Sequence, residues 1–294
     1  MKSEKGYPFV PTFAAAALAI LILCPLRIYQ YFNVLEPETG FYSKTDFSVY
    51  VMYAVIALLA VFSIATAFIN KKNLKHKGIN LSPATGAVAY LLCAVGFGAD
   101  AFKCFTEYLA IKSEYTPSFA QTEAQYASQE GSTFIIIEAA FAVISAIYFL
   151  VLACGHIGKK NVAPKLKLIA LALPAWAVVR ILLKFKTKIS FINVSDLFIT
   201  LFALAFTMLY LLYFAQTVSE VDEGLTYHKL FAYGIPAAVL SLTCFIPRFV
   251  LLVVGRGDLI CPEYGVEPCE LLIPIMIIAT LIARTYDSKK ADKE

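Results

Sequence analysis

Three charged residues interrupt an otherwise apolar stretch of the chain between Val95 and Leu109. Asp100, Lys103 and Glu107 stand at positions i, i+3 and i+7, so on a helix they share one face. Lipid hydrocarbon does not accept such a face, because a charge at the bilayer centre costs ~2.5–3.5 kcal/mol on insertion scales. The spacing therefore predicts that other helices pack around these residues.

Further charged residues lie in other apolar segments, and the topology given below places all of them in the outer half of the bilayer. Glu138 is expected ~9 Å below the outer boundary, at ~1.5 Å of rise per residue. Arg180, Asp196 and Arg248 are expected within one or two helical turns of the outer surface. Together these positions predict a ligand-binding pocket that opens to the outside. Its candidate residues are Asp100, Lys103, Glu138, Arg180 and Arg248.

This group of charges permits more than one interpretation. In the functional one, the pocket holds an ion or a small polar solute. In the structural one, acids and bases form internal ion pairs, and Asp100 and Lys103 neutralise each other on one helix. The acids are then Asp100, Glu138 and Asp196, and the bases are Lys103, Arg180 and Arg248. An intramembrane enzyme would use Asp100 and Glu138 as an acid/base pair, but the sequence offers no nucleophile or metal beside them, which disfavours an enzyme.

The composition defines the class of protein. Hydrophobic residues make up 60% of the 294 residues and charged residues 16%, and the mean hydropathy is +0.72. These values indicate a polytopic membrane protein, and the longest stretch between hydrophobic segments is too short for a folded soluble domain. The net charge of +4 is modest and follows the topology, so it does not indicate nucleic-acid binding. We expect a single integral membrane domain over residues 1–294.

The hydrophobic pattern predicts an all-α transmembrane bundle of about eight spans. The expected spans are residues 9–28, 49–69, 84–109, 133–154, 166–183, 193–214, 230–254 and 268–284. The first is expected to remain uncleaved, because no small-x-small cleavage site follows it. The last is short for a crossing of ~20 residues unless it begins near Pro268.

A recurring basic residue suggests that the spans form four related helical hairpins. Arg27, Lys103, Arg180 and Arg248 all stand near the outer ends of odd-numbered spans. Interfacial basic residues are also common near span ends without any repeat, because they reach the interface at little cost. Both interpretations therefore remain open.

Lysine and arginine counts in the short loops predict the orientation. With eight spans, fifteen of the 25 lysines and arginines fall on the side of the two termini, seven on the opposite side and three within spans. This bias predicts that the N- and C-termini are cytoplasmic.

Cysteines and small residues suggest local contacts rather than chemistry. Cys261 and Cys269 flank the last outer loop, where a disulfide would close the loop in an oxidising compartment. Ala94 and Gly98 form a small-xxx-small pair, which favours close helix packing. No phosphate loop, nucleophile elbow or metal-binding spacing is present in the sequence, so we expect no cofactor and no metal.

Two segments carry a resemblance to a known group of proteins. They are Leu173-Pro-Ala-Trp-Ala-Val-Val-Arg180 and Phe245-Ile-Pro-Arg-Phe249. With the overall helical pattern, they resemble the uncharacterised eight-helix integral membrane proteins of clostridial and related Firmicutes bacteria. The resemblance implies a bacterial plasma membrane and brings no residue with an assigned role. It also makes a disulfide between Cys261 and Cys269 less expected, because such bacteria use structural disulfides sparingly.

The predicted function is binding or transport of a small polar solute or ion through the outward-facing charged pocket, with the lipid bilayer as the surroundings. The alternative is a non-transporting sensor or assembly component that acts through a membrane or cytoplasmic protein partner, with the intramembrane charges as structural salt bridges. A transporter would be stabilised by its solute. A sensor would instead be isolated together with its partner.

Overall fold

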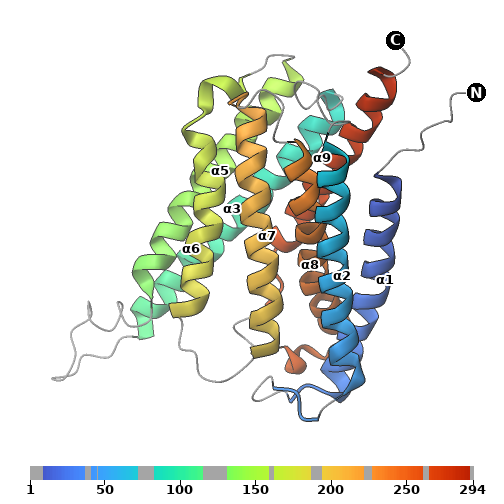
Figure 1. Cartoon of the computed structure of the whole chain (residues 1–294). Coiled ribbons are helices and arrows are strands. Elements are labelled where there is room, and N and C mark those ends of the chain that lie inside the picture. Colours follow the sequence, from blue (N-terminus) through green and yellow to red (C-terminus); the bar gives the residue numbers. More distant parts are fainter. Residues whose placement is uncertain are drawn as a thin grey trace, which may run out of the picture.

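The computed structural model describes residues 9–36, 41–44, 46–71, 83–114, 131–158, 162–186, 194–221, 227–260 and 265–291. Within these ranges the regular elements are eight α-helices and three short 3₁₀ helices, without a β-strand. The α-helices are α1 (Val10–Asn33), α2 (Phe47–Ile69), α3 (Pro83–Glu114), α5 (Ser132–Ile157), α6 (Ala172–Lys186), α7 (Val194–Val218), α8 (Tyr227–Val253) and α9 (Cys269–Ala291), and the 3₁₀ helices are η2 (Ala163–Leu166), η3 (Ile169–Leu171) and η4 (Gly257–Leu259). The chain is an all-α helical bundle (Figure 1), as predicted.

Six helices of the described chain are long and apolar enough to cross a membrane, namely α1, α2, α3, α5, α7 and α8. The protein is therefore a multi-pass membrane protein. The apolar part of α9, Cys269–Ala283, is shorter, and α6 has 15 residues, against the ~20 that a crossing needs. The total of eight crossings stays a prediction.

Local signals explain where several helices begin. Pro11 lies in the first turn of α1, where a proline ring fits because the backbone N–H of that turn has no partner in the helix. The carboxylate of Asp46 caps α2 by accepting a hydrogen bond of 2.8 Å from the backbone N–H of Ser48. Gly131 precedes α5 with a φ of 83°, which residues with a Cβ rarely adopt.

Helix α8 forms the centre of the bundle. Twenty of its 27 residues are buried, and it packs against α1, α2, α7 and α9. A helix that is apolar on all sides is expected in such a position. Most of the remaining major contacts join neighbours in the sequence, above all α3 with α5 and α6 with α7, and α3 also packs against α9.

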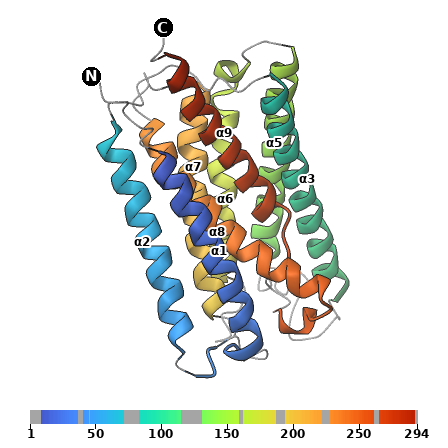
Figure 2. The same cartoon turned by 90° about the vertical axis from the view of Figure 1, so that its right-hand side faces the viewer.

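The first residues of α1 and the last residues of α9 lie at the same end of the bundle, which we call the terminal end (Figure 1). Figure 2 shows that α9 covers only the half of the bundle nearer the terminal end. The residues just before α9 therefore lie deep among the other helices. This placement brings two acidic residues, Glu267 and Glu270, into the interior.

A glycine of α3 permits the close approach of α9. A Cβ at Gly96 would come within 3.2 Å of the Leu272 side chain and 3.7 Å of the Cys269 sulfur. Gly98 is exposed and has no atom within 4 Å of its Cβ position. The prediction of a contact face at Ala94 and Gly98 is therefore wrong for Gly98, because the face of α3 turned to α9 carries Gly96.

Candidate functional site

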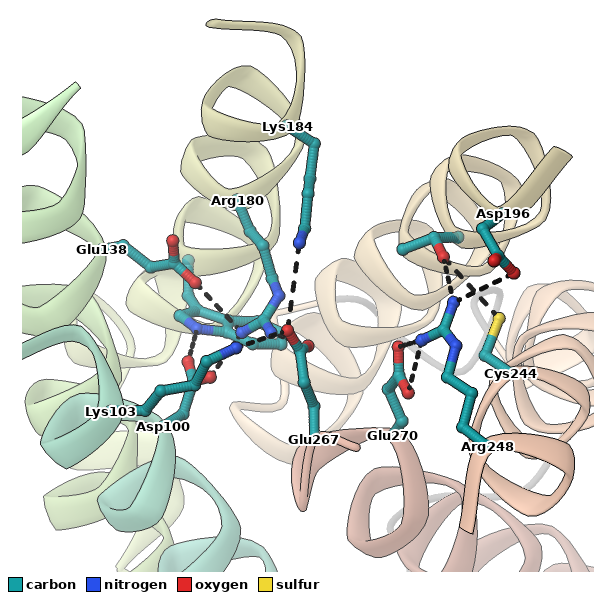
Figure 3. A network of polar contacts seen from close by, with 12 residues as sticks. Asp100, Lys103, Glu138, Arg180, Lys184, Asp196, Cys244, Arg248, Glu267 and Glu270 are labelled. Carbon is teal, nitrogen blue, oxygen red and sulfur yellow. Dashed lines mark hydrogen bonds and ion pairs between the residues drawn. The ribbon is translucent and has the colours of Figure 1, made fainter. Parts of the chain in front are cut away.

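Charged side chains of the described helices gather into two neighbouring networks (Figure 3). Each takes one glutamate from the beginning of the C-terminal segment, Glu267 just before α9 in the first and Glu270 in the first turn of α9 in the second. We call the first the Arg180 network; it contains Asp100, Lys103, Glu138, Trp176, Arg180, Lys184 and Glu267. We call the second the Arg248 network; it contains Arg27, Gln30, Tyr31, Asp196, Thr200, Arg248 and Glu270.

In the Arg180 network, three carboxylates share one guanidinium group. Nη1 of Arg180 donates to Asp100 Oδ1 at 2.5 Å and to Glu138 Oε1 at 3.0 Å. Nη2 donates to the carboxylate of Glu267. All four side chains are buried. The carboxylates come from α3, from α5 and from the segment before α9, so Arg180 on α6 joins four parts of the bundle.

Trp176 and Phe97 hold Asp100 and Arg180 in position. Trp176 precedes Arg180 by one helical turn, its Nε1 donates to Asp100 Oδ2 at 2.7 Å, and its ring lies 5.1 Å from the guanidinium carbon of Arg180. Phe97 lies one turn before Asp100 on α3 and meets the Trp176 ring edge-on, with 4.8 Å between ring centroids. Residues three or four apart face the same side of a helix, so each aromatic ring supports the charge that follows it.

Two lysines supply positive charge at the edge of the Arg180 network. Lys103 Nζ lies 2.9 Å from Glu267 Oε1, and 46% of its side chain is exposed. Lys184 Nζ lies 3.9 Å from the same oxygen. The buried part of the network thus has three carboxylates and one guanidinium, and its neutrality depends on ammonium groups that approach from the edge.

The Arg248 network is balanced by its own side chains, of which Arg27, Asp196 and Arg248 are buried and Glu270 is partly buried. Asp196 Oδ1 accepts from Arg27 Nη2 at 2.7 Å and from the Tyr31 hydroxyl at 2.8 Å, and it lies 3.6 Å from Arg248 Nη2. Arg248 Nη1 donates to the Glu270 carboxylate at 3.2 Å. Two guanidinium groups and two carboxylates therefore neutralise each other here.

A small cavity lies beside both networks. Its volume is about 20 Å³, and a single water needs ~10–15 Å³ on this measure. Its charged and hydroxyl-bearing lining residues are Arg180, Thr200, Thr207, Ser241, Glu267 and Glu270. The rest of the lining is mostly apolar, with Ala203, Leu204 and Ile273 among it.

The structure distributes the five predicted pocket residues over both networks. Asp100, Glu138 and Arg180 contact one another, Lys103 lies at the edge of the same network, and Arg248 belongs to the other. The expected pair of Asp100 with Lys103 is replaced, because Arg180 takes Asp100 and Glu267 takes Lys103. Whether these residues bind a ligand stays a prediction.

The expectation that Asp100, Lys103 and Glu107 share one enclosed face is wrong for Glu107. Asp100 is buried, whereas Glu107 is exposed. The reason is that α3 continues to Glu114, past the expected end at residue 109, so Glu107 is not a membrane-core residue that needs a partner.

Several members of the networks were not predicted. Arg27 is expected at the outer end of the first span, but α1 continues to Asn33 and Arg27 is buried within it. Glu267 and Lys184 lie outside the expected spans, and Glu270 lies at the start of the last one without a predicted role. Glu267 and Glu270 stand at i, i+3 at the beginning of an apolar helix, where acids favour the positive end of the helix dipole. That pattern was the available signal.

The cysteines do not add a clear chemical site. Among the described residues, Asp100, Cys104 and Glu138 form the one group whose potential metal-ligand atoms lie within 4.8 Å of one another. Both carboxylates already bind Arg180, so the guanidinium takes the place that a metal would need. Cys269 carries a free, buried thiol. Cys261, its expected disulfide partner, lies outside the described residues.

Comparison of the chain with models of known protein families, with curated proteins and with solved structures finds no match. The resemblance to clostridial membrane proteins therefore stays a prediction. The fold and the site define the class of protein, which is an all-helical, multi-pass membrane protein with two buried ionic networks.

Proposed function

We propose that this membrane protein binds and transports a small cation, the proton included, at the Arg180 network. The observation that carries the proposal is the excess of buried carboxylates, with Asp100, Glu138 and Glu267 around the single guanidinium of Arg180. Charges buried without a matching partner are costly in a membrane protein and mark ion pathways and proton relays.

Lys103 indicates how a cation would enter. Its ammonium group contacts the Glu267 carboxylate, yet nearly half of its side chain is exposed. An incoming cation can replace such an ammonium group without moving a helix. The adjacent cavity of about 20 Å³ favours a proton, a water or a single atomic ion, because organic ligands occupy pockets of ~300–1,000 Å³.

The proposal includes a bacterial plasma membrane and cytoplasmic termini. The lysine and arginine bias toward the terminal end supports this orientation. The resemblance to clostridial proteins supports the location. In this orientation the Arg180 network takes its cation from outside the cell.

The alternative function, a membrane component whose ion pairs only brace the helices, is favoured by one observation. The Arg248 network is balanced by its own side chains, and all of its charged groups except the partly buried Glu270 are buried, so it needs no ligand. On that alternative, both networks would respond alike to ions, and a protein partner would be isolated with the chain.

The test measures thermal unfolding of the purified protein in nanodiscs. Wild type, E138Q and K103M are compared in lithium, sodium, potassium and N-methylglucamine chloride at constant ionic strength, and across pH 5–9. A bound cation raises the unfolding midpoint as its concentration increases. At 100 times the dissociation constant, the free energy of unfolding rises by ~2.7 kcal/mol. We expect this response in wild type at one of these cations or at low pH, a stronger response in K103M and none in E138Q.

The matched control is D196N, which makes the same chemical change in the Arg248 network. It should keep the cation response, measured as the difference in midpoint between conditions. Equal behaviour of wild type and E138Q under every condition would overturn the proposal, and loss of the response in D196N as well would show that it is not specific to the Arg180 network.

A further inference from the structure

Two residues with hydroxyl groups line the cavity. Thr207 on α7 and Ser241 on α8 are 3% and 7% exposed, so both are buried, and both line the cavity. A water in the cavity can form hydrogen bonds to hydroxyl groups that border it. The volume of about 20 Å³ is sufficient for that water.

A line of hydroxyl groups leads from this cavity toward the terminal end. Thr200, Thr207 and Tyr210 lie on one face of α7, with ~10.5 Å of rise from Thr200 to Thr207 and ~4.5 Å from Thr207 to Tyr210. The Tyr210 hydroxyl lies 2.6 Å from Thr280 Oγ1 on α9. Thr280 donates its own proton to the Ile277 carbonyl at 2.8 Å, so Tyr210 is the donor to Thr280.

The backbone of α8 keeps Tyr210 in this position. A Cβ at Gly234 would lie 2.9 Å from Cδ2 of Tyr210, so the ring fits only against a glycine. Beyond Tyr210, the Phe214 ring lies between Tyr210 and Tyr90, with centroids 6.0 and 6.1 Å away. Tyr90 in turn lies 5.1 Å from the ring of His156 in the last turn of α5. Tyr90 and His156 are thus polar side chains on the way to the terminal end, and the apolar Phe214 ring separates them from Tyr210.

The lining of the cavity discriminates between a proton and a metal cation. A metal cation must replace its hydration shell with about six oxygen atoms, whereas the cavity wall is mostly apolar and includes Ala203, Leu204 and Ile273. The charged groups that face it are Arg180, Glu267 and Glu270, and the cysteine thiol of Cys269 also borders it. A proton needs only water and hydroxyl groups at hydrogen-bond distance.

We infer that the transported ion is the proton, and that it moves between Glu267 and the Tyr210–Thr280 pair through a water held by Thr207 and Ser241. The inference rests on the proposed function of the Arg180 network. Each transfer breaks one O–H bond and forms another on the neighbouring oxygen, so no other reactant is consumed.

The test uses the full chain in phosphatidylcholine liposomes that contain the pH-sensitive dye pyranine. A potassium gradient with valinomycin makes the interior negative, and the rate of internal acidification is measured for wild type, E138Q and the double variant T207V/S241A. We expect at least a tenfold lower rate in the double variant and recovery of the rate in T207S, which retains the hydroxyl group.

Two matched controls separate the route from the fold. T243V makes the same change in α8, where Thr243 donates to the Val239 carbonyl at 2.8 Å and does not line the cavity. S145A removes the buried Ser145 hydroxyl, which has no hydrogen-bond partner and lies about two turns after Glu138 on α5. Both should conduct protons like wild type. All variants are required to elute as a single folded species, and T207A/S241A replaces the double variant if that one does not fold.

The outcomes distinguish this inference from the proposed function. Wild-type rates in T207V/S241A, or a loss in S145A alone, would overturn the route while E138Q still tests the Arg180 network. Wild-type liposomes no faster than empty ones, together with a cation response in nanodiscs that E138Q removes, would overturn the proton and leave cation binding in place.

Discussion

The Arg180 and Arg248 networks use the same residue types in different proportions. The Arg248 network pairs two buried guanidinium groups with two carboxylates, and Asp196 serves both arginines. The Arg180 network surrounds one guanidinium with three carboxylates and completes its charge with Lys103 and Lys184 from the edge. The charged side chains of the Arg248 network are at most 13% exposed, whereas the Arg180 network becomes neutral only with Lys103, whose side chain is 46% exposed, and Lys184.

This difference shows why a tally of charges does not identify a functional site. Both networks sum to zero, so charge balance alone would assign both a structural role. Burial separates them, because a removable counter-charge permits a ligand and a fully buried one does not. The following variants test that distinction.

Loss of the central arginine should have the largest effect, and it should be larger in the Arg180 network. R180M leaves three buried carboxylates without a guanidinium, whereas R248M leaves Asp196 paired with Arg27 and takes the guanidinium only from the partly buried Glu270. Removing one partner of a buried pair costs ~3–5 kcal/mol. We expect R180M to reach or exceed this range in detergent unfolding and R248M to stay below it. Equal losses would contradict the assigned difference in charge balance.

Loss of one carboxylate charge should destabilise the protein more in the Arg248 network than in the Arg180 network, which is the opposite of the order expected for the arginine variants. D196N removes the negative charge that Arg27 and Arg248 share, and it should cost ~3–5 kcal/mol because these buried arginines lose their counter-charge. E138Q leaves Arg180 with Asp100 and Glu267, so its cost should be smaller than that of D196N. Unfolding free energies of the two variants provide the comparison. If E138Q lowered the free energy of unfolding as much as D196N does, the Arg180 network would need all three of its carboxylates for stability.

A glycine variant should disturb both networks together. G96A places a methyl group 3.2 Å from Leu272 and would push away the start of α9, which carries Glu267 and Glu270. Such overpacking costs ~1–3 kcal/mol. G98A is the matched control on the same helix, where the methyl group meets no atom within 4 Å. Thermal unfolding should detect a lower midpoint for G96A alone, and equal midpoints would show that α9 adjusts without cost.

The smallest effect is expected at the margin of the Arg248 network. Hydrogen bonds from Ser48 hold the pKa of Asp46 below its usual value, and Ser48 also accepts from Gln30, which binds Arg27. A lowered folded-state pKa stabilises the fold above the unfolded pKa of ~3.9 and loses that effect as the pH falls through the folded value. D46A should therefore lower the unfolding midpoint slightly at pH 7 and match wild type in strong acid. A difference that grows in acid would contradict this sign.

The all-α membrane fold follows from the sequence because long apolar segments permit no other structure in lipid. The positions of Asp100, Glu138 and Arg180 inside these segments were equally predictable, since a buried charge needs a polar neighbour. Helix ends were less predictable. The continuation of α1 to Asn33 and of α3 to Glu114 changed the environment of Arg27 and Glu107, because hydropathy does not mark where a helix leaves the membrane.

The sequence by itself determined which residues must avoid lipid, since the cost of a charge in hydrocarbon depends on the residue type and its depth. Only the tertiary structure decided the partners. Glu267 and Glu270 follow a loop in the sequence, and they reach the interior because α9 begins deep in the bundle (Figure 2). Contacts between helices distant in the sequence depend on packing geometry, which hydrophobic periodicity does not contain. That geometry divides one set of intramembrane charges into a balanced network and one whose charge is completed at the edge.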